Sequence, residues 1–310
     1  MTATTTDGAP TPGGASRATA APGTPTRRPR GRHTLTRGIV RALQYIALGV
    51  VVFVSAFPLV WAVINSVRPN SEIVAYPPKL IPREFTLEHV RALFELYSFE
   101  QYLWNSLVVS SVSTIGALVL GTTAAYAMTR FDLPAVRAMS VVSLLAYLVP
   151  TILVLIPITQ FFFSNGWGDN RVALMVLYTA TFLPFTIWLL RSYFQGVGAE
   201  VEEAAMIDGC SRLGAFLRVV LPQALPGIVS TGIFAFNATW SEYLFVSTLM
   251  TTNSKLTANP AVFLLMGHMG TTSWGLLMSA AVIIVLPVLL LFFIAQRWVI
   301  SGISDGSVKG

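Results

Sequence analysis

Six long apolar runs, separated by shorter polar segments, dominate the pattern of hydrophobic and polar positions along the chain. They cover residues 42–64, 104–128, 139–163, 172–190, 225–250 and 276–295. At about 1.5 Å per residue in a helix, each run can cross a hydrocarbon core of about 30 Å. Backbone polar groups in lipid must be satisfied within the chain, and the runs lack the apolar–polar alternation of barrel strands. The pattern predicts an all-α membrane protein with six transmembrane helices.

The composition agrees with a membrane protein. Of 310 residues, 54% are apolar and only 11% are Asp, Glu, Lys or Arg, whereas a soluble domain carries about 25% charged residues. These values exclude a soluble globular, disordered or fibrous chain. The single cysteine, Cys210, excludes an intrachain disulfide, and the absence of H-E-x-x-H or clustered Cys and His argues against a metal site. The three histidines are scattered, which favours solvated loop positions over ligation.

The N-terminal segment and the distribution of basic residues predict the orientation. Residues 1–38 hold few large apolar side chains and predict a disordered tail. The Arg27-Arg28 pair resembles a twin-arginine export signal, but the first apolar run is 23 residues long without a following A-x-A site, which favours an uncleaved anchor. With the tail inside, inner segments hold 14 Lys and Arg residues and outer segments six. The net charge of +6 therefore orients the chain, with both termini cytoplasmic, and does not indicate nucleic-acid binding.

Two polar segments are long enough to fold outside the membrane. In the outer segment, 65–103, the stretch from Thr86 to Leu96 has apolar residues at helical spacing and predicts a short amphipathic helix capped by Thr86. The inner segment, 191–222, predicts two short helices. Acidic residues begin the first of them, which suits the positive end of the helix dipole, and Gly209 is placed to end it. The second runs from Ser211 to Val220 and stops at Leu221-Pro222.

A motif in this inner segment carries a family resemblance. Glu203-Ala204-Ala205, followed by Gly209, Val219 and Leu221-Pro222, resembles the EAA loop of ABC importer permeases. The resemblance covers nearly all of residues 39–310 and is closest to the carbohydrate-uptake branch, in particular the smaller maltose-type permease subunit. Two departures are Val219, where the family usually has isoleucine, and Ser241, where the sugar branch commonly has asparagine. Supporting stretches are Asn105-Ser106, Ala125 to Phe131, Pro184-Phe185, Trp240 with Glu242, and the C-terminal Arg297 to Gly310.

The resemblance implies a fold, a function and partners. The fold would be that of a type I ABC importer permease, with residues 39–310 as a multi-pass domain of the bacterial cytoplasmic membrane and residues 196–222 as its coupling loop. The chain would be a non-catalytic subunit without a cofactor or metal of its own, forming half of the path of a sugar importer. Partners would be a homologous permease in a heterodimer, two ATP-binding subunits that hold ATP and Mg, and an extracellular substrate-binding protein. The chain has no G-x-x-x-x-G-K-[ST] motif, so the ATPase must be a separate polypeptide.

The resemblance also assigns site residues. In the family the EAA helix docks into a cleft of the ATPase subunit, and ATP-driven closure moves the permease between inward- and outward-open states. Asp208 would either cap the second short helix or contact the ATPase. The implied docking residues are Glu202, Glu203, Ala204, Ala205, Asp208 and Gly209, and the implied tail contacts to the ATPase are Gly306, Lys309 and Gly310.

A second group of residues is expected at the translocation path or gate. A carboxylate within a span is costly, so Glu242 should face protein or water. It could accept hydrogen bonds from sugar hydroxyls, or belong to a structural network at the partner permease, and both readings stay open. A stripe of small residues, Ala117, Gly121 and Ala125, predicts tight helix packing instead. The path candidates are Asn105, Asn237, Trp240, Glu242 and Tyr243.

Two other classes of protein remain as alternatives. A secondary transporter driven by an ion gradient would more often show two homologous halves and several charged residues within its spans. A membrane-embedded enzyme would need paired carboxylates, a Ser/Lys pair or a metal motif near a membrane face. The spans contain no Lys or Arg, which favours a neutral sugar, although disaccharide, oligosaccharide and glycerol-phosphate importers share this architecture.

Overall fold

The computed structural model describes residues 32–77, 81–132, 134–267 and 273–307. It divides into two compact units, residues 1–55 and 56–310. The first unit holds the start of one long helix. That helix begins at Arg32, so residues 32–38 are helical and do not belong to the predicted tail. Residues 1–31 lie outside the described part of the chain.

Every regular element in the described residues is helical, as predicted. The four longest are α1 (Arg32–Ser66), α4 (Phe99–Arg130), α7 (Arg171–Gly196) and α14 (Trp274–Ser307). The others are α2 (Asn70–Ile73), α3 (Glu88–Glu95), α5 (Pro134–Leu148), α6 (Thr151–Ser164), α8 (Ala199–Ile207), α9 (Arg212–Ala215), the π-helix η1 (Phe216–Val220), α10 (Leu221–Gln223), α11 (Leu225–Trp240), α12 (Leu244–Leu249), the 3₁₀-helix η2 (Asn253–Lys255) and α13 (Ala258–Gly267).

Four of the six apolar runs lie within single helices, and two are broken. Among the described residues, α1, α4, α7 and α14 are long and apolar enough to cross a membrane. The run 139–163 is divided between α5 and α6 at Val149-Pro150, because proline has no N–H and disfavours helical backbone in the residue before it. The run 225–250 is divided between α11 and α12 at residues 241–243. One unbroken helix for each of these two runs was therefore the wrong expectation.

The second unit is built on α4, which packs along α7 and α11, while α11 also packs along α14. The small-residue stripe explains how closely α4 and α7 approach. A Cβ atom on Gly121 would lie 2.5 Å from the methyl group of Thr186, and Ala117 and Ala125 are fully buried. The prediction that this stripe serves helix packing is confirmed.

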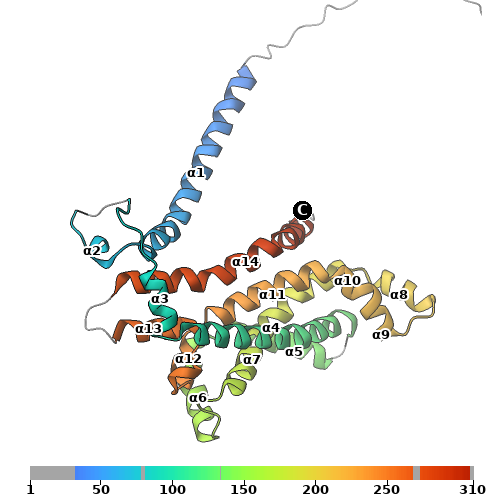
Figure 1. The fold of residues 1–310 in the computed structure, drawn as a ribbon. Helices are drawn as coiled ribbons and strands as arrows, with labels where there is room; N and C mark the ends of the chain where they lie inside the picture. The colour runs from blue at the N-terminus through green and yellow to red at the C-terminus, as the bar shows by residue number, and fades with distance from the viewer. Residues whose placement is uncertain (1–31, 78–80, 133, 268–272, 308–310) are drawn as a thin grey trace, which may run out of the picture. The chain divides into compact units, whose positions relative to one another are not determined.

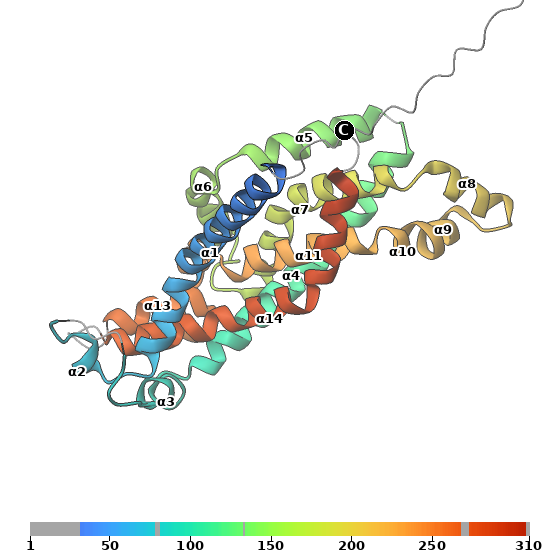
Figure 2. The same ribbon diagram turned by 90° about the horizontal axis from the view of Figure 1, so that it is seen from above.

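The polar segments gather at opposite ends of the second unit. In both views, α8, α9 and α10 lie at one end of α4 and α11, whereas α2, α3 and α13 lie at the other (Figures 1 and 2). We call these the loop end and the outer end. The predicted amphipathic helix is present at the outer end as α3, where the Thr86 hydroxyl accepts from the Glu88 N–H at 3.1 Å. His89 on α3 is buried with its ring nitrogen 2.9 Å from the carbonyl of Arg68, so a solvated position for this histidine was wrong.

Asp169, between α6 and α7, holds the segment that follows α12. Its carboxylate accepts from the Thr251 and Thr252 N–H groups at 3.1 and 3.0 Å, and from the Thr252 hydroxyl at 2.7 Å. The Lys255 ammonium also donates to it at 2.7 Å. Lys255 and Thr252 together hold the pKa of the Asp169 carboxyl well below its ordinary value of 3.8. Two segments about 80 residues apart in the sequence are thereby tied at one carboxylate.

Asp169→Asn should lower the thermal unfolding midpoint at pH 7, and this difference from the wild type should shrink as the pH falls below about 4. The carboxyl has a lower pKa folded than unfolded, so its contribution is complete above the unfolded value and is lost as the pH falls. Unfolding followed by intrinsic fluorescence in detergent between pH 3 and 7 measures both quantities. Glu95→Gln, at an exposed position on α3, is the control. A difference that stays constant over this range would contradict the assignment.

Candidate functional site

The loop at residues 196–222 begins with α8, a helix of nine residues whose start is set by its sequence. Gly198 is the N-cap, and Glu200 and Glu202 lie in the first turn, where carboxylates interact favourably with the helix dipole. Ala204 and Ala205 follow as strong helix formers. The predicted first helix is confirmed.

Gly209 ends α8 in the way that its position predicts. Its φ is +95°, a conformation that L side chains rarely adopt. The Gly209 N–H donates to the Met206 carbonyl at 3.1 Å, and the Cys210 N–H donates to the Ala205 carbonyl at 3.0 Å. This pair of bonds is the Schellman motif, which satisfies the last carbonyls of the helix.

The second half of the loop is helical from Arg212 to Gln223. Ser211 caps it by accepting from the Gly214 N–H at 3.1 Å, so of the two roles open to Asp208, capping this helix is excluded. The helix contains the π-helical segment η1 and then meets α11 at an angle of 71°. Phe216 and Val220 are buried, whereas Leu213 and Leu217 are exposed.

Four exposed residues of α8 recur at helical spacing along one side of the helix, which we call the outer face. It contains Glu200, Glu203, Ala204 and Ile207, with Asp208 beside it. Ile207 is 86% exposed, and sequence reasoning did not select it. A single exposed apolar side chain is ordinary at a protein surface, so the docking assignment rests on Glu203 and Ala204 of the predicted set, which this face exposes. The outer face is therefore a candidate docking surface.

Two residues predicted for docking point the other way. Glu202 is 3% exposed and Ala205 is 8% exposed, on the side of α8 that faces the bundle. The Glu202 carboxylate pairs with Arg130 at the end of α4, at 2.8 Å. These two side chains are engaged within the chain, which leaves Glu203, Ala204, Asp208 and Gly209 as the exposed members of the predicted docking set.

Of the path candidates, Trp240 and Asn105 lie in the interior of the chain. The Trp240 ring stacks on Phe236, and its Nε1–H donates to the Ile284 carbonyl of α14 at 3.1 Å. The Asn105 amide donates to the carbonyls of Ser254 and Leu256 at 2.9 and 2.8 Å and accepts from Arg171. Both side chains join helices and loops of this unit.

Glu242 lies at the break between α11 and α12 and satisfies the backbone there. Its carboxylate accepts from the Phe245 N–H at 3.0 Å, from the Val246 N–H at 3.4 Å and from the Tyr178 hydroxyl of α7. The first N–H groups of a helix have no partners within it, so the carboxylate stabilises the start of α12. A structural network around Glu242 therefore exists within this chain, and sequence reasoning did not identify Tyr178 as part of it.

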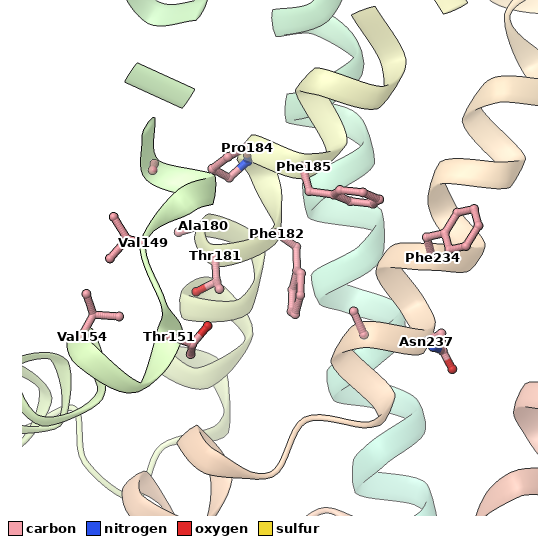
Figure 3. Close-up of a pocket in the computed structure, with 12 residues that line it drawn as sticks. Val149, Thr151, Val154, Ala180, Thr181, Phe182, Pro184, Phe185, Phe234 and Asn237 are labelled. Carbon is pink, nitrogen blue, oxygen red and sulfur yellow. The ribbon is translucent and has the colours of Figure 1, made fainter. Parts of the chain in front are cut away.

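Asn237 and Tyr243 are the path candidates with partly open surroundings. Asn237 lines a cavity of about 570 Å³ between α5, α6, α7 and α11. Figure 3 shows Thr151 and Thr181 close together on one side of it, and Phe185 of α7 extending toward Phe234 of α11. Tyr243 is 37% exposed, and its ring lies 4.9 Å from that of Phe263.

The predicted tail contacts are largely outside the described residues. Lys309 and Gly310 lie beyond them, and Gly306 belongs to the last turns of α14.

In the part of the chain that the structure describes, no group of three His, Cys, Asp or Glu residues could hold a metal ion.

Comparison with known proteins gives consistent matches. The profile of a family described as binding-protein-dependent transport system inner membrane component matches residues 117–305. The inner membrane ABC transporter permease protein YcjP of Escherichia coli is 31% identical over 279 residues, covering 89% of this chain and 99% of that protein. The diacetylchitobiose uptake system permease protein DasC of Streptomyces coelicolor is 32% identical over 268 residues, covering 84% and 95%.

A third relative and a solved structure extend the comparison. The trehalose/maltose transport system permease protein MalG of Thermococcus litoralis is 29% identical over 272 residues, covering 87% of this chain and 97% of that protein. A chain in the crystal structure of a bacterial ABC transporter involved in the import of the acidic polysaccharide alginate matches with a TM-score of 0.74 and 18% identity, covering 86% and 98%. At that identity the match establishes a shared fold.

Gly209→Ala should destabilise the turn after α8 by about 1–2 kcal/mol, because a Cβ atom is unfavourable at positive φ. The thermal unfolding midpoint should fall, and proteolysis after Arg212 within the loop should become faster. Gly196→Ala is the matched control, since a Cβ there has no neighbour within 4 Å and its φ is not positive. Equal effects of the two substitutions would show that the backbone conformation of Gly209 is unimportant.

Proposed function

The chain belongs to the family of binding-protein-dependent transport system inner membrane components, and we propose that it forms half of the membrane path of a sugar importer. It is a non-catalytic permease subunit of an ABC transporter. The observation that carries the coupling part of this proposal is the outer face of α8, with Glu203 and Ile207 exposed beside a turn fixed by Gly209.

The proposal of a sugar rests on the relatives and on the spans. Relatives that cover most of the chain are described as permeases for diacetylchitobiose, for trehalose and maltose, and for trehalose. The six apolar runs contain no Lys or Arg, so they offer no cation to a phosphate-bearing substrate. The relatives favour a sugar, and the absence of cations from the runs favours a neutral one.

We further propose six spans with both termini in the cytoplasm of a bacterial cell. Four spans would be α1, α4, α7 and α14, and the other two would be the broken helices α5–α6 and α11–α12. The two parts α5 and α6 have 15 and 14 residues. At about 1.5 Å per residue, they together exceed a hydrocarbon core of about 30 Å. The excess of Lys and Arg in the segments assigned to the inside supports this orientation.

The single cysteine of the chain tests the orientation. Cys210 lies in the 196–222 loop and is partly exposed. A membrane-impermeant maleimide should label it in inside-out vesicles and leave it unlabelled in intact spheroplasts. The control is Tyr76→Cys in a Cys210→Ser background, because Tyr76 is 95% exposed in the segment assigned to the outside. It should show the opposite pattern, and labelling of Cys210 from outside would overturn the topology.

In the proposed mechanism, the outer face of α8 docks on a separate ATPase subunit that binds ATP and Mg. Ala204 presents little side chain, so a partner surface can approach closely, while Glu203 offers a carboxylate to a basic group. A second permease subunit would complete the path in a heterodimer, and an extracellular binding protein would deliver the sugar. ATP-driven closure of the ATPase pair would then switch the path between its two openings.

Glu203→Lys should reduce ATP-dependent uptake to the level of cells that lack the chain, while the protein still inserts in the membrane. The substitution replaces an exposed carboxylate on the docking surface with a cation. Uptake is measured with radiolabelled trehalose, maltose and diacetylchitobiose, and docking by co-purification of the ATPase subunit. Glu95→Lys, at another exposed glutamate, on α3 at the outer end, is the control and should transport normally. Normal uptake by Glu203→Lys would remove the docking assignment.

A further inference from the structure

Three separate parts of the 196–222 loop contact the loop end of α4, at residues 126–131. Glu202 of α8 accepts from Tyr126 and Arg130. From η1, the Phe216 ring lies 4.4 Å from the Tyr126 ring. The third contact comes from α9, where the guanidinium of Arg212 lies 5.2 Å above the ring of Phe131. The loop is therefore fastened to this one helix end by polar, aromatic and cation–π contacts.

The contacts of Glu202 are the most directional of these. Its Oε2 accepts from the Arg130 Nε at 2.8 Å, and its Oε1 accepts from the Tyr126 hydroxyl at 2.5 Å. The side chains of Arg130 and Glu202 are only 9% and 3% exposed. In a buried pair the cost of desolvating the two charges largely offsets their attraction, whereas removing one member leaves the other charge uncompensated.

Arg130 also fixes the approach to α8. Its Nη2 donates to the carbonyl of Val197 at 2.8 Å, just before the Gly198 N-cap. Tyr126 lies in an apolar cluster with Phe194 of α7 and Phe216 of η1. Arg130 thus contacts the chain both just before α8, at Val197, and within its first turn, at Glu202. These two contacts set the orientation of α8 relative to α4.

The two sides of α8 have different surroundings. Glu203 and Ile207 lie on its outer face, whereas Glu202 lies on the opposite side and reaches α4. A displacement applied to the outer face can reach α4 through the side chain of Glu202 and the aromatic contacts beside it.

The helix that receives this displacement is the least interrupted one in the unit. Among the described helices of 26 residues or more, α1, α7 and α14 contain Pro58, Pro184 and Pro287, whereas α4 contains no proline. Its 32 residues extend over about 48 Å. At its outer end, Asn105 and Ser106 bind the backbone of residues 254–258. One stiff helix thus connects the 196–222 loop with residues 254–258, which follow α12.

We propose that Glu202, Tyr126 and Arg130 are positioning residues that form the joint between the ATPase docking surface and α4. Through this joint, movement of α8 becomes movement of α4 and of residues 254–258, which are bound to α4. This inference rests on the proposed function. It assigns Glu202 to transmission within the chain, in place of the docking role expected from the motif.

The test uses the complete transporter, with its partner permease, ATPase subunits and binding protein, in proteoliposomes. Glu202→Gln keeps the size of the side chain and removes its charge, and Tyr126→Phe removes only the hydroxyl. Both variants should retain the ATPase subunit and hydrolyse ATP, while the amount of sugar transported per ATP falls about tenfold, as expected when a coupling network loses a polar contact. Glu95→Gln, the same substitution at an exposed position of α3 at the outer end, should leave this ratio unchanged.

A charge exchange distinguishes the joint from a general structural role. Glu202→Arg combined with Arg130→Glu should recover transport per ATP relative to either single substitution, because the buried pair is restored. An unchanged ratio in Glu202→Gln and Tyr126→Phe would overturn the joint, and so would loss of the ATPase subunit, which would make Glu202 a docking residue. Failure of the wild-type chain to co-purify with any ATPase would instead refute the proposed function, and the joint with it.

Discussion

The backbone of a chain in lipid has no water to bind, and this constraint explains most of the architecture. Helices satisfy their own N–H and C=O groups, so each apolar run folds as a helix or as two helical parts. Where a run is broken, other groups must replace the missing bonds. At the start of α12 the Glu242 carboxylate does this by accepting from the Phe245 and Val246 N–H groups. The cost of an acid within an apolar run is offset by the backbone groups that it satisfies.

The same principle accounts for other polar residues that resemble functional ones in the sequence. Asn105 is buried, and its amide donates to the carbonyls of Ser254 and Leu256 and accepts from Arg171. Glu202 lies within the acidic motif, yet its carboxylate is buried against Arg130. A buried polar group is stable only with partners, so such residues become fixed points between elements. Their conspicuous positions in the sequence reflect this need as much as a contact with substrate or a partner protein.

These fixed points lie at the two ends of α4. At the loop end, Tyr126 and Arg130 hold α8, and at the outer end, Asn105 and Ser106 hold residues 254–258. Between these two ends, the absence of a side chain at Gly121 lets α7 pack closely against α4. A single helix without proline therefore runs between the two sets of contacts.

Local features of the sequence were sufficient for the four unbroken helices, the stripe of small residues on α4, and the turn at Gly209, because each depends on residues close together in the chain. The spacing of Glu202, Glu203 and Ala205 also divides them between two sides of α8. Which side faces the bundle was decided only by the tertiary structure, since it depends on Arg130 and Tyr126, more than 70 residues away. For the same reason the partners of Glu242 and Asp169 could not be predicted. Spacing determines which residues share a face, but the stability of a buried charge depends on groups that only folding brings beside it.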